Sequence, residues 1–166
     1  LSLEQVEVLK NLSNYKVVSN DVSRFADILI DVERLRFTNT NLAIDLEGSA
    51  GQTAKTLAAV LGSDSLSNKQ YVGVGLQLFD AGQSLATVCG LALQAAGAST
   101  NEQVVNTLYS NLYGEAPTAE LAQPFVDALD AGTYSQGFLA ATAAELTDDL
   151  GVIDLVGLAE TGIEYV

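Results

Sequence analysis

The scarcity of proline constrains this chain more than any other feature of its sequence. Its 166 residues include only Pro117 and Pro124, so long stretches can be helical without interruption. Three segments also begin as capping boxes, in which a hydroxyl residue and a Gln three positions later satisfy backbone amides at a helix start. They are Ser2-Leu-Glu-Gln5, Ser67-Asn-Lys-Gln70 and Thr100-Asn-Glu-Gln103. These signals predict a helix-rich fold.

Apolar residues recur at spacings of three and four along most of the chain, as they do on the buried face of a helix. This spacing predicts helices over about 3–14, 21–37, 52–61, 68–81, 83–96, 101–113, 118–131 and 135–147. A short helix around 152–159 and an extended end should follow. Residues 38–51 are compatible with a loop and either a short helix or a strand.

Together these segments predict an all-α fold, a compact bundle of about seven to eight helices. We expect an N-terminal helical region over residues 1–66 and a helical repeat region over residues 67–166. At this length the two regions should form one compact unit.

The charge balance excludes several classes of partner. The chain carries 21 acidic and 7 basic residues, a net charge of −14, which disfavours nucleic acid and anionic lipid. No apolar stretch reaches the roughly 18 residues of a membrane span, so we expect no membrane insertion. The acidity either only keeps the protein soluble or also serves a function such as calcium binding.

The side chains of common active sites are scarce. There is no His, and one Cys cannot build a zinc site, so we predict a non-enzyme with no catalytic, cofactor-binding or metal residues. Cys89 lies in an apolar run, which favours a buried structural thiol. Gly73-Val-Gly75 begins a Gly-x-Gly pattern but lacks the preceding strand and third glycine of a dinucleotide site.

Paired carboxylates are the remaining candidates for chemistry. Asp127 with Asp130, or Asp148 with Asp149, could act as acid and base, although an acidic solvated face explains them more simply. A loose surface calcium site from Asp148, Asp149 and Asp154 is the other alternative, although no EF-hand pattern is present.

One segment occurs twice in a degenerate form. Residues 79–84 (Phe-Asp-Ala-Gly-Gln-Ser) are similar to residues 129–135 (Leu-Asp-Ala-Gly-Thr-Tyr-Ser). Each copy is predicted to end one helix, turn at Gly and begin another helix near Ser. This pattern indicates a duplicated helix–turn–helix unit.

The better-formed copy, residues 101–146, resembles the DUF4214 family of helical domains. The matching residues are Leu108-Tyr109, Asn111, Gly114, Gly132 and Ser135. Glu115 replaces the usual Arg, and the usual Trp is absent, with Phe125 as the nearest aromatic residue. The resemblance implies an extracellular or cell-surface bacterial protein of the S-layer or RTX type, with no known catalysis and no defined ligand.

The end of the sequence is a second indication of secretion. Glu164-Tyr165-Val166 places an acidic residue before a hydrophobic end, as in many type I secretion substrates, although it could equally be a final packed strand. The sequence begins at Leu1 without a visible signal peptide, as in a processed protein or an excised domain.

These features predict a non-catalytic structural or interaction module that works through self-association or a protein partner. The alternative is a domain that binds a small ligand or a glycan, for which Tyr134 and Tyr165 are the freest aromatic residues. We expect no cofactor, with calcium as the one open possibility.

Overall fold

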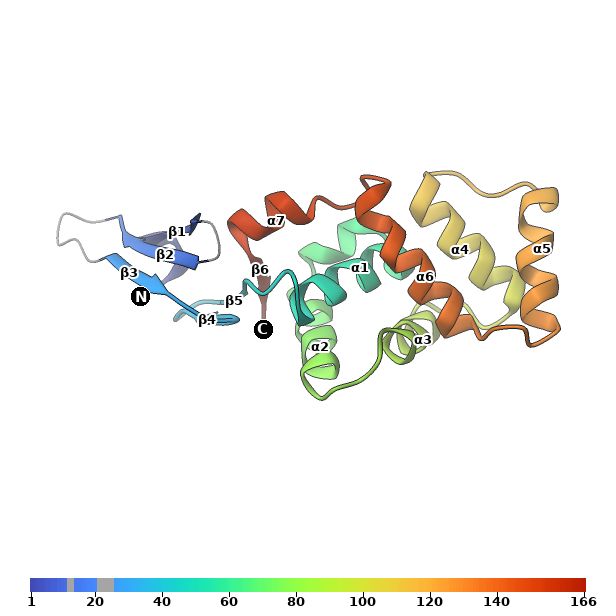
Figure 1. Ribbon diagram of the computed structural model, residues 1–166, viewed down its shortest axis with the longest axis horizontal. Helices are drawn as coiled ribbons and strands as arrows, with labels where there is room; N and C mark the ends of the chain where they lie inside the picture. Colours follow the sequence, from blue (N-terminus) through green and yellow to red (C-terminus); the bar gives the residue numbers. More distant parts are fainter. Residues whose placement is uncertain (12–13, 21–25) are drawn as a thin grey trace.

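Figure 1 shows the computed structural model of the chain, which describes residues 1–11, 14–20 and 26–166. Two small β-sheets lie toward one end of the long axis, and the helices fill the rest of the molecule. The strands are β1 (Val6–Asn11), β2 (Asn14–Ser19), β3 (Ala26–Leu29), β4 (Arg34–Arg36), β5 (Asn41–Ala43) and β6 (Ile163–Tyr165). The helices are α1 (Ser49–Leu61), α2 (Lys69–Asp80), α3 (Leu85–Ala95), α4 (Asn101–Tyr113), α5 (Ala119–Asp130), α6 (Gln136–Asp149) and α7 (Leu155–Thr161).

Both sheets are antiparallel and three-stranded. Sheet A has the strand order β1-β2-β3, and sheet B has the order β4-β5-β6. Sheet B joins distant parts of the sequence, because Asn41 of β5 lies opposite Tyr165 of β6. The last strand therefore belongs to the same sheet as the segment that precedes the helices.

The expectation of an all-α fold is wrong, because the described residues up to Ala43 form strands and turns. The capping box at Ser2 does form, with the Gln5 side chain accepting from the Ser2 amide at 2.9 Å, but it caps only a 3-10 turn over Leu3–Gln5. The segment that follows alternates Val6, Glu7 and Val8, and β-branched residues at alternate positions suit a strand.

The two helices predicted at 3–14 and 21–37 are therefore wrong: the described residues there form a 3-10 turn, strands and short irregular stretches. Residues 12–13 and 21–25 lie outside the described residues. Within the second segment, residues 26–29 form β3 and residues 34–36 form β4. Apolar residues at helical spacing did not produce a helix there, because pairing with β2 and β5 satisfies the backbone instead.

From residue 49 onward the predicted helices are confirmed to within a few residues at each end. The capping box at Thr100 is formed, since Thr100 accepts from the Gln103 amide and the Gln103 side chain accepts from the Thr100 amide. The second predicted box is shifted by one residue. Asn68 is the N-cap of α2 and accepts from the amides of Gln70 and Tyr71. Pro124 lies inside α5.

The two similar segments adopt the same turn. In the first, the Gly82 amide donates to Phe79 and the Gln83 amide donates to Leu78. In the second, Gly132 donates to Leu129 and Thr133 donates to Ala128. Both glycines have positive φ, as this helix C-cap requires, and Ser84 and Ser135 then cap the next helices.

The core mixes residues from both sides of the expected boundary at residue 66. One cluster joins Val60 of α1 with Cys89, Leu93, Val104 and Ala144. The helices α3 and α6 approach closely at Gly137, where a Cβ atom would lie 2.4 Å from the Ala86 carbonyl oxygen. A second cluster joins Leu57 and Leu76 to Ile163 of sheet B, so sheet B and the helices share this core.

Candidate functional site

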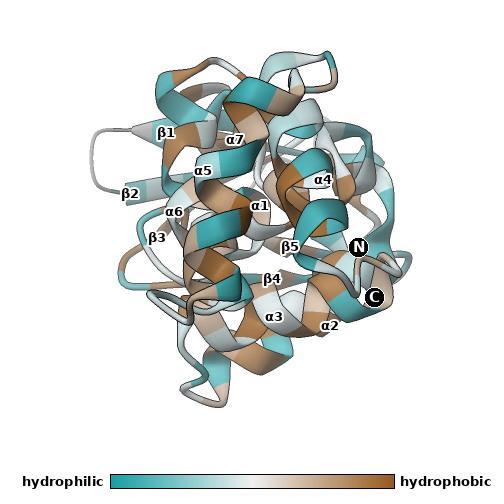
Figure 2. Cartoon of the chain, turned by 90° about the vertical axis from the view of Figure 1, so that its right-hand side faces the viewer, coloured by the Kyte–Doolittle hydropathy of each residue, from teal (hydrophilic) through white to brown (hydrophobic). Residues whose placement is uncertain are grey.

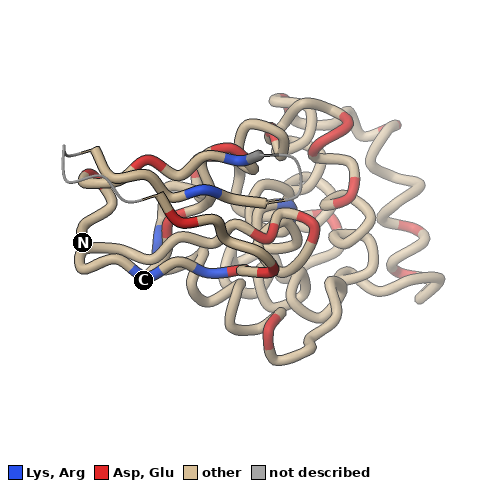
Figure 3. The backbone as a smooth tube through the Cα atoms, turned by 60° about the vertical axis from the view of Figure 1, so that its left-hand side comes forward, with Lys and Arg blue, Asp and Glu red and all other residues tan. Residues whose placement is uncertain are grey.

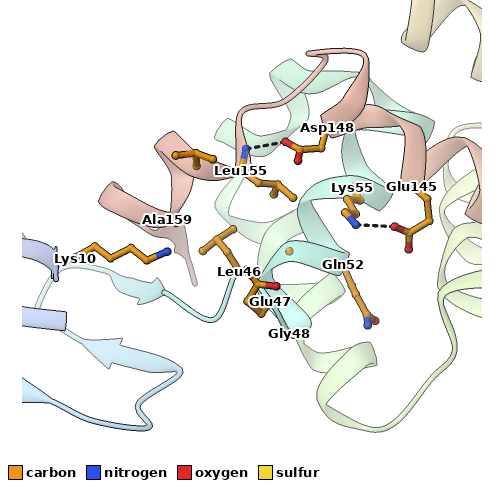
Figure 4. A pocket seen from close by; sticks show the side chains of 12 residues that line it. Lys10, Leu46, Glu47, Gly48, Gln52, Lys55, Glu145, Asp148, Leu155 and Ala159 are labelled. Carbon is orange, nitrogen blue, oxygen red and sulfur yellow. Dashed lines mark hydrogen bonds and ion pairs between the residues drawn. The ribbon is translucent and has the colours of Figure 1, made fainter. Parts of the chain in front are cut away.

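The largest of the described cavities is a polar cleft between sheet A and the helices, with a volume of about 490 Å³ (Figure 4). It lies where β1, the start of α1, the end of α6 and α7 meet. Its lining consists of Lys10, Leu46, Glu47, Gly48, Gly51, Gln52, Lys55, Glu145, Asp148, Leu155, Val156 and Ala159. We call it the polar cleft.

Charged side chains of both signs face the polar cleft. Lys55 pairs with Glu145 at 2.6 Å, and Asp148 accepts from the backbone amide of Leu155 at 3.2 Å. Lys10 reaches toward Leu46 from the opposite wall (Figure 4) and makes no ion pair within the described residues. Within the described residues the cleft therefore offers one ammonium group, Lys10, and one carboxylate, Glu47, that make no ion pair, and several groups that already have partners.

Asp45 holds the wall of the cleft in place. Its carboxylate pairs with Arg34 and accepts a hydrogen bond from the Ala50 amide at the start of α1. Burial raises the pKa of the Asp45 carboxyl, and the nearby Arg34 guanidinium only partly offsets this. Arg34 also bonds to Asp80 at 3.0 Å, so one guanidinium ties β4 to the segment before α1 and to the end of α2.

A tyrosine fixes sheet A against the helices. The Tyr15 hydroxyl oxygen lies 2.9 Å from the Ile44 carbonyl oxygen and 2.8 Å from that of Ala159. The hydroxyl has one proton, so it donates to one carbonyl at a time. Burial is the main cause that raises the pKa of Tyr15.

A second cavity is an apolar groove of about 240 Å³ between α1, α2 and α3. Its lining consists of Thr53, Thr56, Leu57, Leu61, Tyr71, Val74, Gly75, Leu78, Val88, Leu91, Ala92 and Ala95. Large apolar side chains remain exposed around it: Tyr71 is 49% exposed, Val74 56% and Leu91 44%. We call this surface the apolar groove.

No charged residue lines the apolar groove. On α2 the charged residues are Lys69 and Asp80 at its two ends, and α3 has none. The ribbon of α3 is accordingly mostly white to brown in Figure 2. The groove and helix α3 therefore form an uncharged surface on a chain whose net charge is −14.

The paired carboxylates considered as acid and base lie on exposed helix faces. Asp127 accepts from the side chain of Gln123 at 2.7 Å, and Asp130 accepts from that of Asn101 at 2.6 Å. Asp149 is also exposed, at the end of α6. The structure places none of these three in the polar cleft or the apolar groove.

Two of the three carboxylates considered for a calcium site accept hydrogen bonds from backbone amides. Asp148 bonds to the Leu155 amide, and Asp154 caps α7 by accepting from the Gly157 amide at 2.9 Å. Over residues 1–11, 14–20 and 26–166, no three acidic or Cys side chains gather in a metal-binding cluster. Calcium thus stays an untested possibility.

Cys89 is fully buried, as the sequence predicted, and its Sγ lies 3.7 Å from the Thr56 hydroxyl. Burial raises the pKa of the thiol to about 11. Tyr134 and Tyr165, expected to be the freest aromatic residues, are half-buried. Tyr134 lies against Phe138, with ring centroids 6.1 Å apart.

The end of the sequence is a packed strand. Residues 163–165 form β6, and Glu164 pairs with Lys69 at 2.5 Å. The hydrogen bond from Lys69 lowers the pKa of the Glu164 carboxyl.

Of the candidate site residues named from the sequence, Asp148 lines the polar cleft and Gly75 lines the apolar groove, but the rest of either lining was not singled out. Lys10, Lys55 and Glu145 come from three elements far apart in the chain, so no local motif could have grouped them. Tyr71 and Val74 were assigned to helix α2, but their helical spacing predicted a buried face, whereas both are exposed.

Comparisons with family models, curated proteins and solved structures found no match. Among the described helices, none is both long and apolar enough to cross a lipid bilayer.

Proposed function

We propose that this chain is a non-catalytic interaction module of a secreted or cell-surface bacterial protein, and that its apolar groove binds an amphipathic helix of a protein partner. The exposed apolar side chains around the groove carry this proposal. Tyr71, Val74 and Leu91 leave large apolar areas in water, and such surfaces usually mark interaction sites.

The apolar lining of the groove favours a helix as the partner. The groove lies between α1, α2 and α3 and has a volume of about 240 Å³. Amphipathic helices dock into grooves of this kind through apolar side chains spaced by three and four residues. An extended peptide would instead need unpaired strand edges, and the groove has only helices around it.

The charge of the chain selects among such helices. The groove contributes no charge of its own, but the whole chain carries a net charge of −14. A helix with basic residues on its polar face is attracted at long range, and one with acidic residues is repelled.

The extracellular setting rests on the likeness of residues 101–146 to the DUF4214 family. The shared turn geometry at Gly82 and Gly132 supports the duplicated helical unit from which that likeness was argued. The −14 charge is also compatible with a secreted protein.

A peptide panel tests the groove. Three designed helical peptides would share one leucine face and carry Lys, Gln or Glu on the polar face. We expect fluorescence anisotropy to show binding in the order Lys, then Gln, then Glu. Added salt should narrow the differences, because it screens the charge of the chain.

Matched variants locate the binding. Leu91→Asp places a charge on the groove and should abolish binding, whereas Leu146→Asp alters a comparably exposed leucine of α6 outside both cavities and should not. Binding of none of the peptides, or equal binding by both variants, would overturn the proposal.

A specific observation also supports the alternative, a site for a small ligand. The polar cleft is large enough for a small molecule, and Lys10 has no ion-pair partner there within the described residues. No aromatic residue lines the cleft, which disfavours a glycan, and the Lys10 ammonium group is the feature that would bind a small carboxylate.

Thermal unfolding with short carboxylates, amino acids and monosaccharides tests this alternative. A carboxylate that raises the midpoint in the native chain should lose its effect in Lys10→Met. Lys16→Met, on the opposite face of the same sheet, is the control. An unchanged midpoint with every compound would count against a ligand in the cleft.

A further inference from the structure

Sheet A has an inner and an outer face. Tyr15 lies on the inner face, because its hydroxyl reaches the carbonyls of Ile44 and Ala159. Neighbouring residues of a strand point to opposite faces, so Lys16 lies on the outer face. Leu9 and Ile28 lie opposite Lys16 in the adjacent strands and share that face.

The outer face of sheet A carries exposed apolar side chains beside two charged ones, Lys16 and Glu7. Leu9 is 40% exposed and Ile28 is 69% exposed, and Ile30, directly after β3, is 63% exposed. Lys16 lies in the middle of them and makes no ion pair within the described residues. An antiparallel sheet normally buries one apolar face, and here apolar side chains lie on both.

Helix α5 has an uncovered apolar stripe as well. It packs on α4 through Ala122 and Leu129, which are buried. Leu121 and Phe125 are 50% and 45% exposed, and Pro124 and Ala128 continue the same stripe at helical spacing. Figure 2 looks onto this end of the molecule, where α5 shows both hydrophobic and hydrophilic segments.

The two surfaces are complementary in charge. Glu120 and Asp127 project on the flank of the α5 stripe, as their helical positions require. All Lys and Arg residues of the chain lie within residues 1–69, so the end that carries α5 is purely acidic. Figure 3 shows the basic residues concentrated toward the strands. Within the described strands of sheet A, the outer face carries one cation, Lys16, and one carboxylate, Glu7.

The two surfaces cannot meet within one molecule. Sheet A lies at one end of the long axis and α5 at the other (Figure 1). The two surfaces can nevertheless pack on each other between molecules, because a helix with an apolar stripe commonly covers an apolar sheet face.

We propose that α5 of one copy docks on the outer face of sheet A of a second copy, so that this chain assembles head to tail. The contact places Leu121 and Phe125 against Leu9 and Ile28, with Lys16 beside the flanking carboxylates. The two surfaces of the contact are different, so each copy that is added leaves one unoccupied surface at each end of the assembly. The same contact can therefore repeat to form a row of copies. This inference shares with the proposed function only the premise that the chain acts by binding other proteins through its surface. Here the partner is a second copy of the chain.

Sedimentation velocity of the purified chain over a range of concentrations tests the assembly. The sedimentation coefficient should rise with concentration. Ile28→Asp and Phe125→Asp should each remain monomeric, because each loses one of the two surfaces.

Mixing the two variants is the decisive measurement. The Ile28→Asp copy keeps α5, and the Phe125→Asp copy keeps the sheet face, so an equal mixture should form a 1:1 dimer and nothing larger. Both positions are exposed, and circular dichroism should show an unchanged fold. Leu146→Asp, an exposed apolar position outside both surfaces, should assemble like the native chain.

Lys16→Glu gives an independent readout at a surface residue that the core does not use. It should weaken assembly by at least tenfold in dissociation constant. A native chain that sediments as a monomer at every concentration would overturn the inference, as would a mixture that stays monomeric. Leu91→Asp separates the two proposals, because it removes peptide binding to the apolar groove but should leave assembly intact.

Discussion

Thr53 shows how a single buried hydroxyl affects stability. Its side chain is 1% exposed, and within the described residues its Oγ1 has no hydrogen-bond partner. Thr147 is equally buried, but its Oγ1 donates to the Ala144 carbonyl at 2.7 Å. A buried hydroxyl without a partner loses its hydrogen bonds to water and gains none in the protein. A bonded hydroxyl replaces them with a hydrogen bond inside the protein.

We therefore expect Thr53→Val to stabilise the protein by about 1 kcal/mol, because valine has nearly the same shape without the unpaired oxygen. Urea unfolding measures the change. Thr147→Val is the matched control and should be destabilising by about 1 kcal/mol. If both substitutions lower the free energy of unfolding equally, Thr53 has a partner in solution.

Cys89 should be inert in the folded protein. With a thiol pKa of about 11, about one thiol in a thousand is ionised at pH 8, and the side chain is fully buried. Ellman's reagent should give no signal at pH 8 in native buffer and one thiol per chain in guanidinium. Since Cys89 is the only cysteine, a rapid native reaction would directly contradict its burial.

At the scale of elements, the structure corrects the residue that caps the start of helix α2. The sequence pattern assigned the start of α2 to Ser67, but Asn68 accepts from the Gln70 and Tyr71 amides. The Ser67 hydroxyl instead donates to the Asp64 carbonyl at 2.7 Å. Adjacent residues with polar side chains make such starts ambiguous by one position.

The two residues can be separated by mutation. Asn68→Ala should destabilise the protein by about 1 kcal/mol, because two amides at the start of α2 lose their acceptor. Ser67→Ala should change stability by less than about 0.5 kcal/mol. Thermal or urea unfolding compares the two variants, and a larger loss in Ser67→Ala would restore the assignment from the sequence.

At the scale of the whole molecule, sheet B joins residues 34–43, which precede the α-helices, to residues 163–165, which follow them. Ile163 of β6 is 3% exposed and packs in the same core as Leu57 and Leu76. The Val166 amide also donates to the Lys69 carbonyl at 3.3 Å. The last strand is therefore part of the core.

Removing the Ile163 side chain should weaken the whole fold. Ile163→Ala is expected to cost about 3 kcal/mol, since it leaves a cavity between the strands and α1. Val166→Ala changes a side chain that is 63% exposed and should cost less than about 0.5 kcal/mol. Comparable losses in the two variants would show that β6 is not held in the core.

The sequence by itself determined the helices from residue 49 onward and the turns between them. Their signals are local: a capping residue such as Thr100, a glycine with positive φ such as Gly132, and apolar residues at helical spacing. Each signal acts within one or two turns of chain, so it can be recognised without knowing the rest of the fold.

Only the tertiary structure decided the strands, the two cavities and the uncovered faces. Asn41 pairs with Tyr165 across most of the chain, and Lys10 shares a cleft with Glu145 of α6. Residues 26–36 have a helical spacing of apolar residues, yet residues 26–29 pair with β2 and residues 34–36 pair with β5 as strands. Strand pairing and surface exposure depend on which distant segments meet, and that information is not present in any local stretch of sequence.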